Sequence, residues 1–412
     1  MFSRDPTAKG RRVTRALRCL SPALAIILAS TPASAQRQVL SGSVFVDANG
    51  NGIRDTEERG VAGVAVSNQD TVVTTDDLGV FHIARGSSGI VFVSVPDGYR
   101  ARGSFWRTVA GSATSVSFGL TQSGHVRDFS FVHASDTHIA PASADRTRRL
   151  GALVDSISPA FLIVTGDLVR DALRVSEPEA TGYYELFMKE TGAFRTPMWT
   201  VPGNHENFGI ERDKSHVSAT NSLYGRAMYH KYLGPDYYSF NYGGVHFIGL
   251  NTADIEDQAY YGHVDSLQLA WLARDLALVP ATTPVVTFDH IPFVSTFFGL
   301  NGYDDGPPAP SLITVKGKTV FRHIVSNAGQ VLAVLRKRRH VLALGGHFHA
   351  AEKVVYEMDG QRTRFNLTSA IVAPTNSAGL RFPSGVTLYS VRDGVIDDGK
   401  FISLGLPERV TP

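Results

Sequence analysis

The sequence predicts a multidomain protein in which an all-β module precedes an α/β domain. Residues 38–122 consist of short runs rich in Val, Phe and Thr, separated by clusters of Gly, Asn, Asp and Pro, which is typical of strands and turns. From residue 126 onward, apolar strands alternate with helical segments, which is the α/β pattern. A length of 412 residues accommodates two or three domains, and 43% hydrophobic with 19% charged residues is an ordinary globular composition.

The first 35 residues resemble a secretory signal peptide. Six basic residues precede the apolar run Leu20–Ser30, and Ala33-Ser34-Ala35 offers the small residues of a cleavage site. The run is too short for a comfortable membrane span, and an uncleaved anchor is the alternative interpretation. We therefore expect cleavage near Ala35, a secreted or periplasmic location, and a mature chain without a transmembrane span.

Composition narrows the chemistry that the mature chain can carry out. Removing the six basic residues and the one acidic residue of the leader leaves 34 Lys+Arg and 37 Asp+Glu. Nucleic-acid-binding domains are usually clearly basic, so we expect no stable complex with nucleic acid. The only cysteine, Cys19, lies in the leader, so the mature chain has neither a disulfide nor a cysteine ligand for a metal.

The all-β module, residues 38–122, resembles the immunoglobulin-like or prealbumin-like β-sandwiches of bacterial secreted proteins. Within it, residues 47–58 have the spacing of an EF-hand calcium loop, although the flanking residues alternate like strands. The alternative is a polar turn, because Asn and Gly are residues that any sharp turn favours. The expected ligands of a structural calcium ion are Asp47, Asn49, Asn51, the carbonyl of Ile53, Asp55 and Glu58.

Five short motifs follow apolar strands in the α/β domain, which we assign to residues 126–405. The carboxyl ends of strands are where open α/β sheets place their sites, so loops far apart in the sequence converge there. A lone histidine at a strand end is weak evidence, but five motifs in this arrangement are hard to explain as core packing. In chain order they are Ser-Asp-Thr-His (135–138), Gly-Asp-Leu-Val-Arg-Asp (166–171), Gly-Asn-His-Glu (203–206), Asp-His (289–290) and Gly-His-Phe-His (346–349).

The residue types in these motifs suit a pair of divalent cations. Imidazole and carboxylate together favour manganese, iron or zinc. Asp136 and His138 are alternate residues, as are His347 and His349, so on an extended segment the members of each pair point the same way. Asp167 can bridge two ions through its two oxygens, and two ions about 3.5–4 Å apart can activate water and clamp a phosphate.

On these motifs the sequence resembles the calcineurin-like metallophosphoesterase superfamily over roughly residues 126–405. The resemblance implies a four-layer α/β domain in which two mixed β-sheets are flanked by helices. It implies that His205, which is not a ligand, contacts the phosphate and helps the leaving group depart. It also implies one metal bound by Asp136, His138, Asp167 and His349, and a second bound by Asp167, Asn204, His290 and His347.

Two positions after the second motif depart from branches of this superfamily. Arg170 stands where purple acid phosphatases have the tyrosine that binds iron, so we expect no tyrosinate–iron absorption band. In the protein-phosphatase branch the same position holds the Asp that pairs with the catalytic histidine, whereas here the acid is Asp171, one residue later. Asp171 is therefore a candidate catalytic residue that either pairs with His205 or is a plain surface carboxylate.

The predicted function is an exported, dinuclear-metal phosphoesterase. A hydroxide that bridges the metals would attack the phosphorus of a phosphomonoester or phosphodiester. Small molecules, nucleotides and phospholipid head groups all remain candidate substrates, because a phosphate clamp says little about the leaving group. The alternative is a non-catalytic surface or adhesion protein whose rear domain is a relic phosphoesterase. All seven side-chain ligands are present, which favours the enzyme.

Overall fold

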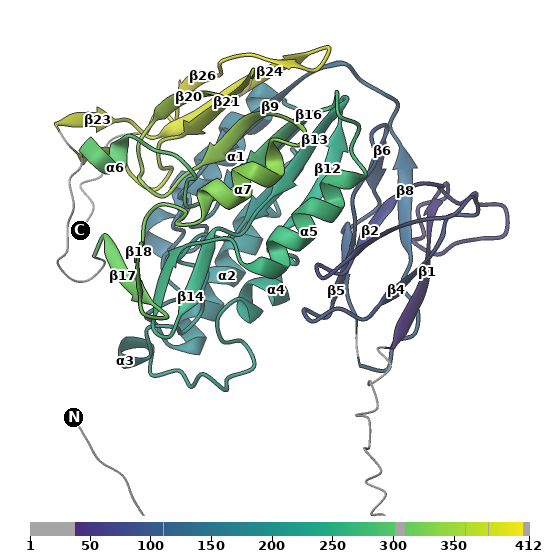
Figure 1. Cartoon of the computed structure of the whole chain (residues 1–412), viewed down its shortest axis with the longest axis horizontal. Coiled ribbons are helices and arrows are strands. Elements are labelled where there is room, and N and C mark those ends of the chain that lie inside the picture. The colour runs from purple at the N-terminus through teal and green to yellow at the C-terminus, as the bar shows by residue number, and fades with distance from the viewer. Residues whose placement is uncertain (1–37, 110, 301–309, 359, 378, 407–412) are drawn as a thin grey trace, which may run out of the picture. The chain divides into compact units, whose positions relative to one another are not determined.

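The computed structural model describes residues 38–109, 111–300, 310–358, 360–377 and 379–406 (Figure 1). The expected signal peptide, residues 1–35, lies outside this part of the chain. Among the described residues, no helix combines the length and the apolar character that crossing a membrane requires.

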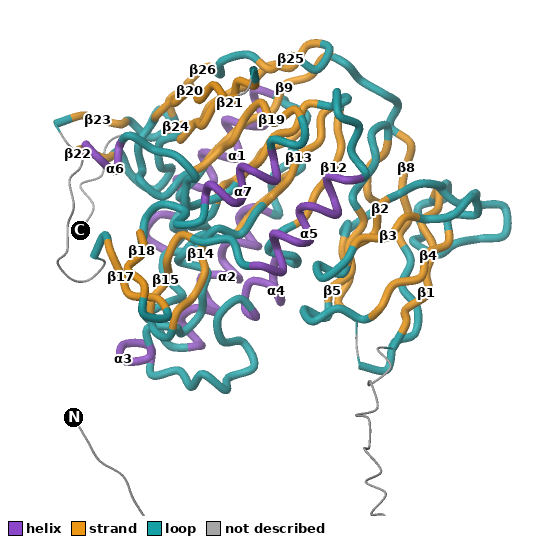
Figure 2. The backbone as a smooth tube through the Cα atoms, viewed as in Figure 1, coloured by secondary structure: helices purple, strands orange, loops and turns teal. Residues whose placement is uncertain are grey.

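The N-terminal module contains strands and loops but no helix in its described residues (Figure 2). Its strands form two four-stranded sheets, in the orders β4-β1-β8-β6 and β3-β2-β5-β7. Val44 and Phe118 of the first sheet belong to the same buried apolar cluster as Val66 and Phe92 of the second. The strands are β1 (Val39–Val46), β2 (Ala65–Ser67), β3 (Val72–Thr74), β4 (Val80–Ala84), β5 (Ile90–Val93), β6 (Tyr99–Ala101), β7 (Trp106–Thr108) and β8 (Phe118–Gln122).

Buried side chains of this module bond directly to the α/β domain. The Trp271 indole N–H donates to Ser67 Oγ at 3.1 Å, and the Phe92 ring meets the Trp271 ring edge-on with centroids 6.3 Å apart. The Gln69 amide donates to the buried Asp236 carboxylate at 2.8 Å. The module therefore shares part of its core with the α/β domain.

The first sheet of the α/β domain has six strands, in the order β11-β10-β9-β24-β25 with β26 also beside β24. β9, β10 and β11 run parallel, whereas β24 pairs antiparallel with β9, β25 and β26. The strands are β9 (Asp128–Ala134), β10 (Phe161–Thr165), β11 (Met198–Val201), β24 (Gly385–Arg392), β25 (Val395–Ile396) and β26 (Lys400–Ser403).

The second sheet also has six strands, in the order β12-β13-β16-β19-β21-β20. Its four central strands are parallel, and the edge strands β12 and β20 are antiparallel to their neighbours. The strands are β12 (Tyr238–Tyr242), β13 (Val245–Gly249), β16 (Pro284–Phe288), β19 (Arg339–Gly345), β20 (Glu352–Met358) and β21 (Gln361–Leu367).

Alternation along the strands explains how these sheets are layered. In β10, Phe161 belongs to the cluster between the sheets and Leu162 to the cluster under the helices, as expected because successive side chains point to opposite faces. Phe161 also meets Phe247 of the second sheet, with centroids 5.2 Å apart. The two mixed sheets thus face each other and carry helices outside, the arrangement expected from the sequence.

The helices form one layer on each outer face, with α5 and α7 toward the viewer in Figure 1. α5 begins at the N-cap Asp265, whose carboxylate accepts the Gln268 N–H, and it buries Trp271, Leu272 and Leu276 on one side. The helices of the first sheet are α1 (Ala144–Ile157), which follows a short turn η1 (Pro141–Ser143), α2 (Glu177–Thr191) and α4 (Ala227–Leu233), and those of the second are α5 (Ser266–Ala277) and α7 (Ala328–Leu335).

Three small hairpins and two single-turn helices complete the described chain. Helix α7 begins only at Ala328. The residues before it continue from β18 into a loop, which places His323 outside any helix. These elements are β14 (Ala253–Glu256), β15 (Ala259–Gly262), β17 (Leu312–Val315), β18 (Lys318–Phe321), β22 (Thr375–Ser377), β23 (Leu380–Phe382), α3 (Arg212–Ser215) and α6 (Phe297–Leu300).

Candidate metal centre

Each of the five motifs lies just beyond the carboxyl end of a parallel strand. Asp136 and Asp167 follow β9 and β10 by two residues, and Asn204 follows β11 by three. His290 and His347 follow β16 and β19 of the facing sheet by two residues. Both sheets therefore deliver their polar residues to one place, as the position of the motifs predicted.

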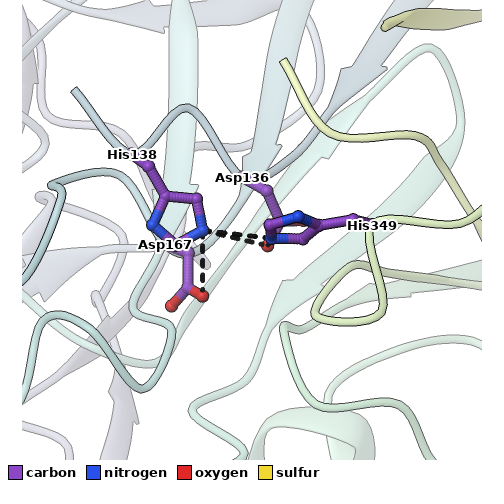
Figure 3. A group of neighbouring side chains, drawn as sticks. All are labelled: Asp136, His138, Asp167 and His349. Atoms are coloured by element: carbon purple, nitrogen blue, oxygen red, sulfur yellow. Dashed lines mark hydrogen bonds and ion pairs between the residues drawn. The ribbon is translucent and has the colours of Figure 1, made fainter. Parts of the chain in front are cut away.

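The first group of side chains consists of Asp136, His138, Asp167 and His349, whose ligand atoms all lie within 4.8 Å of one another. Nε2 of His138 lies 3.1 Å from Nε2 of His349 and 3.5 Å from Oδ2 of Asp167. Figure 3 shows these four side chains pointing toward a common centre. These are the residues that the resemblance assigned to one metal.

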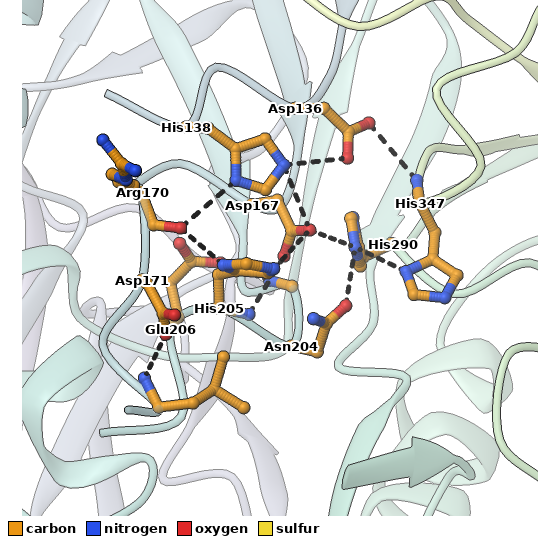
Figure 4. A network of polar contacts seen from close by, with 12 residues as sticks. Asp136, His138, Asp167, Arg170, Asp171, Asn204, His205, Glu206, His290 and His347 are labelled. Carbon is orange, nitrogen blue, oxygen red and sulfur yellow. Dashed lines mark hydrogen bonds and ion pairs between the residues drawn. The ribbon is translucent and has the colours of Figure 1, made fainter. Parts of the chain in front are cut away.

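The second group consists of Asp167, His290 and His347, which satisfy the same 4.8 Å limit. Nε2 of His290 lies 3.1 Å from Oδ2 of Asp167 and 3.2 Å from Nδ1 of His347. Oδ1 of Asn204 also lies 3.2 Å from Nε2 of His290. Asp167 thus belongs to both groups, and Figure 4 shows its carboxylate between His138 and His290.

The polar atoms of these groups fit cations rather than hydrogen bonds among themselves. Nδ1 of His138 and Nδ1 of His290 donate to the carbonyls of Arg170 and Thr165, at 3.4 and 2.8 Å. In a neutral imidazole, Nε2 of each ring then carries a lone pair that faces the centre. Oδ1 of Asp136 is buried there, 3.2 Å from Nε2 of His349 and 3.7 Å from Nε2 of His138. Converging lone pairs of this kind are what divalent metal ions bind.

Five of the candidate ligands have backbone φ angles between 37° and 72°, a region that residues other than glycine rarely adopt. The expectation that paired ligands alternate on extended segments is therefore wrong in its geometry, although the ligands do converge. Left-handed backbone turns the chain sharply at the strand end, and such strain concentrates at functional sites. The five residues are Asp136, His138, Asp167, His347 and His349.

Three of the motifs contain a glycine at a position where a side chain would clash with a neighbouring loop. A Cβ on Gly203 would overlap the Asp167 carboxylate and backbone, and one on Gly346 would overlap Ser135 Oγ and approach Asp136 Oδ2 to 2.8 Å. Gly166 has φ +75° and would bring its Cβ to 2.7 Å from the Gly203 nitrogen. The ligand loops are thus packed directly against one another.

Glu206 is a structural member of the site, and no role was predicted for it from the sequence. Its carboxylate accepts the Gly203 N–H at 2.6 Å and the Leu168 and Val169 N–H groups at 2.8 and 3.0 Å. Burial, with the neighbouring Asp167 charge, raises the pKa of Glu206 to about 7. The side chain ties the loop that carries Asp167 to the loop that carries Asn204. Its place in the Gly-Asn-His-Glu motif was the available signal.

His205 lies beside the first group but is oriented by a partner that the sequence did not identify. Its Nδ1 donates to the Arg170 carbonyl at 2.5 Å, and its Nε2 lies 3.8 Å from Oδ2 of Asp167. A hydrogen bond between Asp171 and His205, one of the two alternatives for this carboxylate, is not found among the described residues. Asp171 instead accepts from Arg174 at 3.1 Å and from the Leu173 N–H at 2.9 Å. The acid stands one residue later than in the protein-phosphatase branch, and at this position its carboxylate contacts the Arg174 guanidinium.

A cavity of about 520 Å³ opens beside the metal ligands and His205. Arg146 and Arg170 both line it, and Arg146 is 2% exposed and donates through Nε to the Ile371 carbonyl at 2.7 Å. Two arginines among its lining residues bring positive charge to this part of the molecule, which favours an anionic occupant. Arg146 lies on helix α1 outside all five motifs, so no pattern in the sequence pointed to it.

The expected calcium loop forms a turn closed by its own hydrogen bonds. Asp47 is buried and accepts the Gly50 and Gly52 N–H groups at 2.7 and 2.9 Å. Asp55 Oδ2 accepts the side-chain amides of Asn49 and Asn51 at 2.6 and 3.1 Å. Glu58 accepts the Ala48 and Asp55 N–H groups at 2.8 and 3.1 Å, whereas Ile53 is exposed. The two groups of His, Asp and Glu found close enough to hold a metal among the described residues both lie in the α/β domain.

Comparison with protein families gives two adjacent matches. The family described as calcineurin-like phosphoesterase matches residues 129–351, and the family described as the N terminal of calcineurin-like phosphoesterase matches residues 48–123. No curated protein matches the chain. The first match spans the five motifs, and the second covers most of the N-terminal module.

The solved structures to which this chain is similar are distant in sequence. A dimetal phosphatase from Danio rerio is 16% identical, with 64% of this chain and 93% of that chain covered and a TM-score of 0.43. GAP50, the anchor in the inner membrane complex of Plasmodium, is 13% identical, with 69% and 87% covered and a TM-score of 0.40. The family match, rather than these likenesses, carries the assignment.

Substituting Gly203 by Ala is expected to remove bound metal. The new Cβ would displace Asp167, which belongs to both ligand groups, and no side-chain rotation relieves an overlap with its backbone nitrogen. Elemental analysis after gel filtration checks this. Gly182→Ala is the matched control, because a Cβ there meets nothing within 4 Å in helix α2, and it is expected to keep the metal and to stabilise folding by about 0.5–1 kcal/mol. Full metal content in Gly203→Ala would contradict the packing argument.

Proposed function

The chain belongs to the calcineurin-like phosphoesterase family, and from this premise we propose that it is a dinuclear-metal phosphoric ester hydrolase. The observation that carries the proposal is that two ligand groups, one built on Asp136 and one on His290, share Asp167. Their imidazole and carboxylate donors suit manganese, iron or zinc. The proposed substrates are phosphomonoesters or phosphodiesters, including small molecules, nucleotides and phospholipid head groups.

Bound divalent cations would supply Lewis-acid activation of water and of the phosphoryl group. The residues around them hold the substrate and move a proton. Arg170 and Arg146 line the cavity and complement the charge of a phosphate. Asn204 and the ligand histidines are fixed by their contacts, so little reorganisation is needed during the reaction.

His205 is the proposed general acid. Its Nδ1 donates to the Arg170 carbonyl, so only the doubly protonated ring can donate from Nε2 to the leaving oxygen. Burial lowers the pKa of His205, and the Asp167 carboxylate acts in the opposite direction. A carbonyl partner orients the ring without adding the negative charge that a carboxylate would bring. The carboxylates of Asp167 and Asp171 both favour protonation of His205.

We also propose that the protein is exported, to the periplasm or beyond the cell, after cleavage near Ala35. The basic and apolar pattern of residues 1–35 and the absence of cysteine from the rest of the sequence support this. The two four-stranded sheets of the N-terminal module suit an immunoglobulin-like or prealbumin-like sandwich.

For residues 47–58 we propose structural calcium. The types and spacing of Asp47, Asn49, Asn51, Asp55 and Glu58 support the proposal. Against it stands the turn closed by internal hydrogen bonds, which needs no ion. The two possibilities differ in metal count and in thermal stability.

The alternative function is a non-catalytic surface or adhesion protein with a relic phosphoesterase domain. A relic is expected to lose ligands, whereas the two groups and Asn204 are complete and face a cavity. The enzyme is therefore the function that we favour.

Metal removal tests the proposed function most directly. The mature protein is expected to contain two transition-metal ions per chain and to hydrolyse bis(p-nitrophenyl) phosphate or p-nitrophenyl phosphate. Chelation should abolish turnover, and added Mn²⁺ should restore it, because a bound metal cation is what activates water in the proposed reaction. A protein that holds no transition metal and hydrolyses neither ester would support the non-catalytic alternative.

Replacing His205 by Ala is expected to slow an alkyl phosphoester by about 10²–10⁴-fold. A p-nitrophenyl ester of the same phosphate should lose much less activity, because its leaving group departs without a proton. The measurement is kcat for both esters in the wild type and the variant, with metal content determined alongside. Equal losses for both leaving groups at full metal content would exclude the general-acid role.

Adding calcium to the chelated protein is expected to raise its Tm if the loop binds the ion. The variant Asp55→Asn should reduce this shift, because it removes one of three charged ligands while keeping an acceptor for the Asn49 and Asn51 amides. A third metal ion per chain in elemental analysis would agree with this. Two metal ions and an unchanged Tm would identify the loop as a polar turn.

A further inference from the structure

His347 has a half-buried imidazole partner, His323, that lies outside all five motifs. Its Nδ1 faces the second ligand group, 3.2 Å from Nε2 of His290, and its Nε2 lies 2.8 Å from Nδ1 of His323. We propose that His323 is a positioning residue that fixes the tautomer of His347 and thereby sets the affinity of the second metal. This inference rests on the proposed dinuclear site.

The two rings are arranged as a hydrogen bond requires. Their centroids are 5.0 Å apart and their planes differ by 25°. The two facing nitrogens are 2.8 Å apart, and each nitrogen lies one ring radius from its own centroid. The centroid separation is close to the sum of these three lengths, so the rings meet edge to edge and are not stacked face to face. A nearly linear N–H···N bond between Nε2 of His347 and Nδ1 of His323 follows from this geometry.

The direction of this bond follows from metal ligation. A metal on Nδ1 of His347 leaves the proton of the neutral ring on Nε2, so His347 donates and Nδ1 of His323 accepts. Outer-sphere acceptors of this kind fix ring orientation and raise the basicity of a ligand. The Tyr260 hydroxyl lies 3.5 Å from the same nitrogen of His323, too far to compete well.

The loop that carries His323 is pinned on both sides. The Gly262 N–H donates to the Arg322 carbonyl at 2.9 Å, and the Ser326 N–H donates back to the Gly262 carbonyl at 2.8 Å. A Cβ on Gly262 would overlap the Ile324 carbonyl, so strand β15 and this loop are in direct contact. His323 is therefore presented to His347 by a fixed segment, as a positioning role requires.

The second ligand group has particular need of such support. Asp167 is its only carboxylate, and that carboxylate is shared, whereas the first group also has Asp136. With less negative charge, binding at the second group depends more on the basicity of His290 and His347. His290 is supported by the Thr165 carbonyl at 2.8 Å, and His323 gives His347 the equivalent support.

Metal titration of two variants of the mature protein tests the role of His323. His323→Leu removes the acceptor and keeps an apolar side chain of similar bulk. His323→Asn is the matched rescue variant, because its amide oxygen offers an acceptor at the δ position where Nδ1 of histidine lies. Each protein is stripped with chelator, titrated with Mn²⁺ by calorimetry and analysed for metal per chain after gel filtration.

We expect the wild type to bind two ions and His323→Leu to weaken one of them by about 10–100-fold. His323→Asn should recover most of the affinity. In a His347→Ala background, where the second group is already broken, His323→Leu should have no further effect. Unchanged Tm values of the stripped proteins confirm that each variant is folded.

Three results would overturn the proposal. Wild-type affinity in His323→Leu would show that the acceptor is not needed. Equal loss in His323→Asn would show that an acceptor at the δ position does not support His347, and loss of both ions would mean that His323 supports the whole site. A wild-type protein that binds fewer than two ions would instead refute the proposed function, so the two failures are distinguishable.

Discussion

The carboxylate of Asp167 is the constraint on which the rest of the site depends. Oδ2 lies 3.1 Å from Nε2 of His290 and 3.5 Å from Nε2 of His138, and these two histidines follow strands of different sheets. Oδ1 accepts the backbone N–H of His205 at 3.0 Å. Burial raises its pKa, but the imidazoles of His290, His205 and His138 outweigh burial and hold the pKa below its ordinary value. Asp167 is therefore ionised, and every neighbouring loop must be placed to suit its two oxygens.

This placement costs conformational freedom and is maintained by packing. The backbone of Asp167 lies in the left-handed region, and this conformation costs a residue other than glycine roughly 1–3 kcal/mol. Gly203 leaves room for it, and Glu206 bonds its loop to the neighbouring one through three N–H groups. The shared core between the two sheets, with Phe161 against Phe247, keeps the strand ends at a fixed separation. The rigid strands thus hold the strained loops in fixed positions relative to one another.

Residue type and position after a strand are local features, and they were enough to select Asp136, Asp167 and His347 as candidate ligands, which the structure brings together. The layers were implied by the resemblance to a known superfamily. The prediction that paired ligands lie on extended segments needed backbone detail and was wrong. Of the two roles left open for Asp171, a hydrogen bond to His205 is not found among the described residues, and its carboxylate bonds to Arg174. Contacts between distant loops, such as His323 with His347, have no local pattern. They arise only when folding brings two sheets together.

The two ligand groups differ in how they can achieve affinity, and this difference explains the surroundings of each. The first group combines two carboxylates, one of them the fully buried Asp136, so attraction between charges dominates its binding. The second relies on imidazoles and the neutral Asn204, whose donor strength depends on what their far sides contact. Short supporting contacts are accordingly found behind His290 and His347, at 2.8 Å each, whereas His138 has a longer contact of 3.4 Å. Because Asp167 joins both groups, weakening the contact behind His347 would affect the proposed second ion first, and an ion in the first group would still hold the shared carboxylate in place.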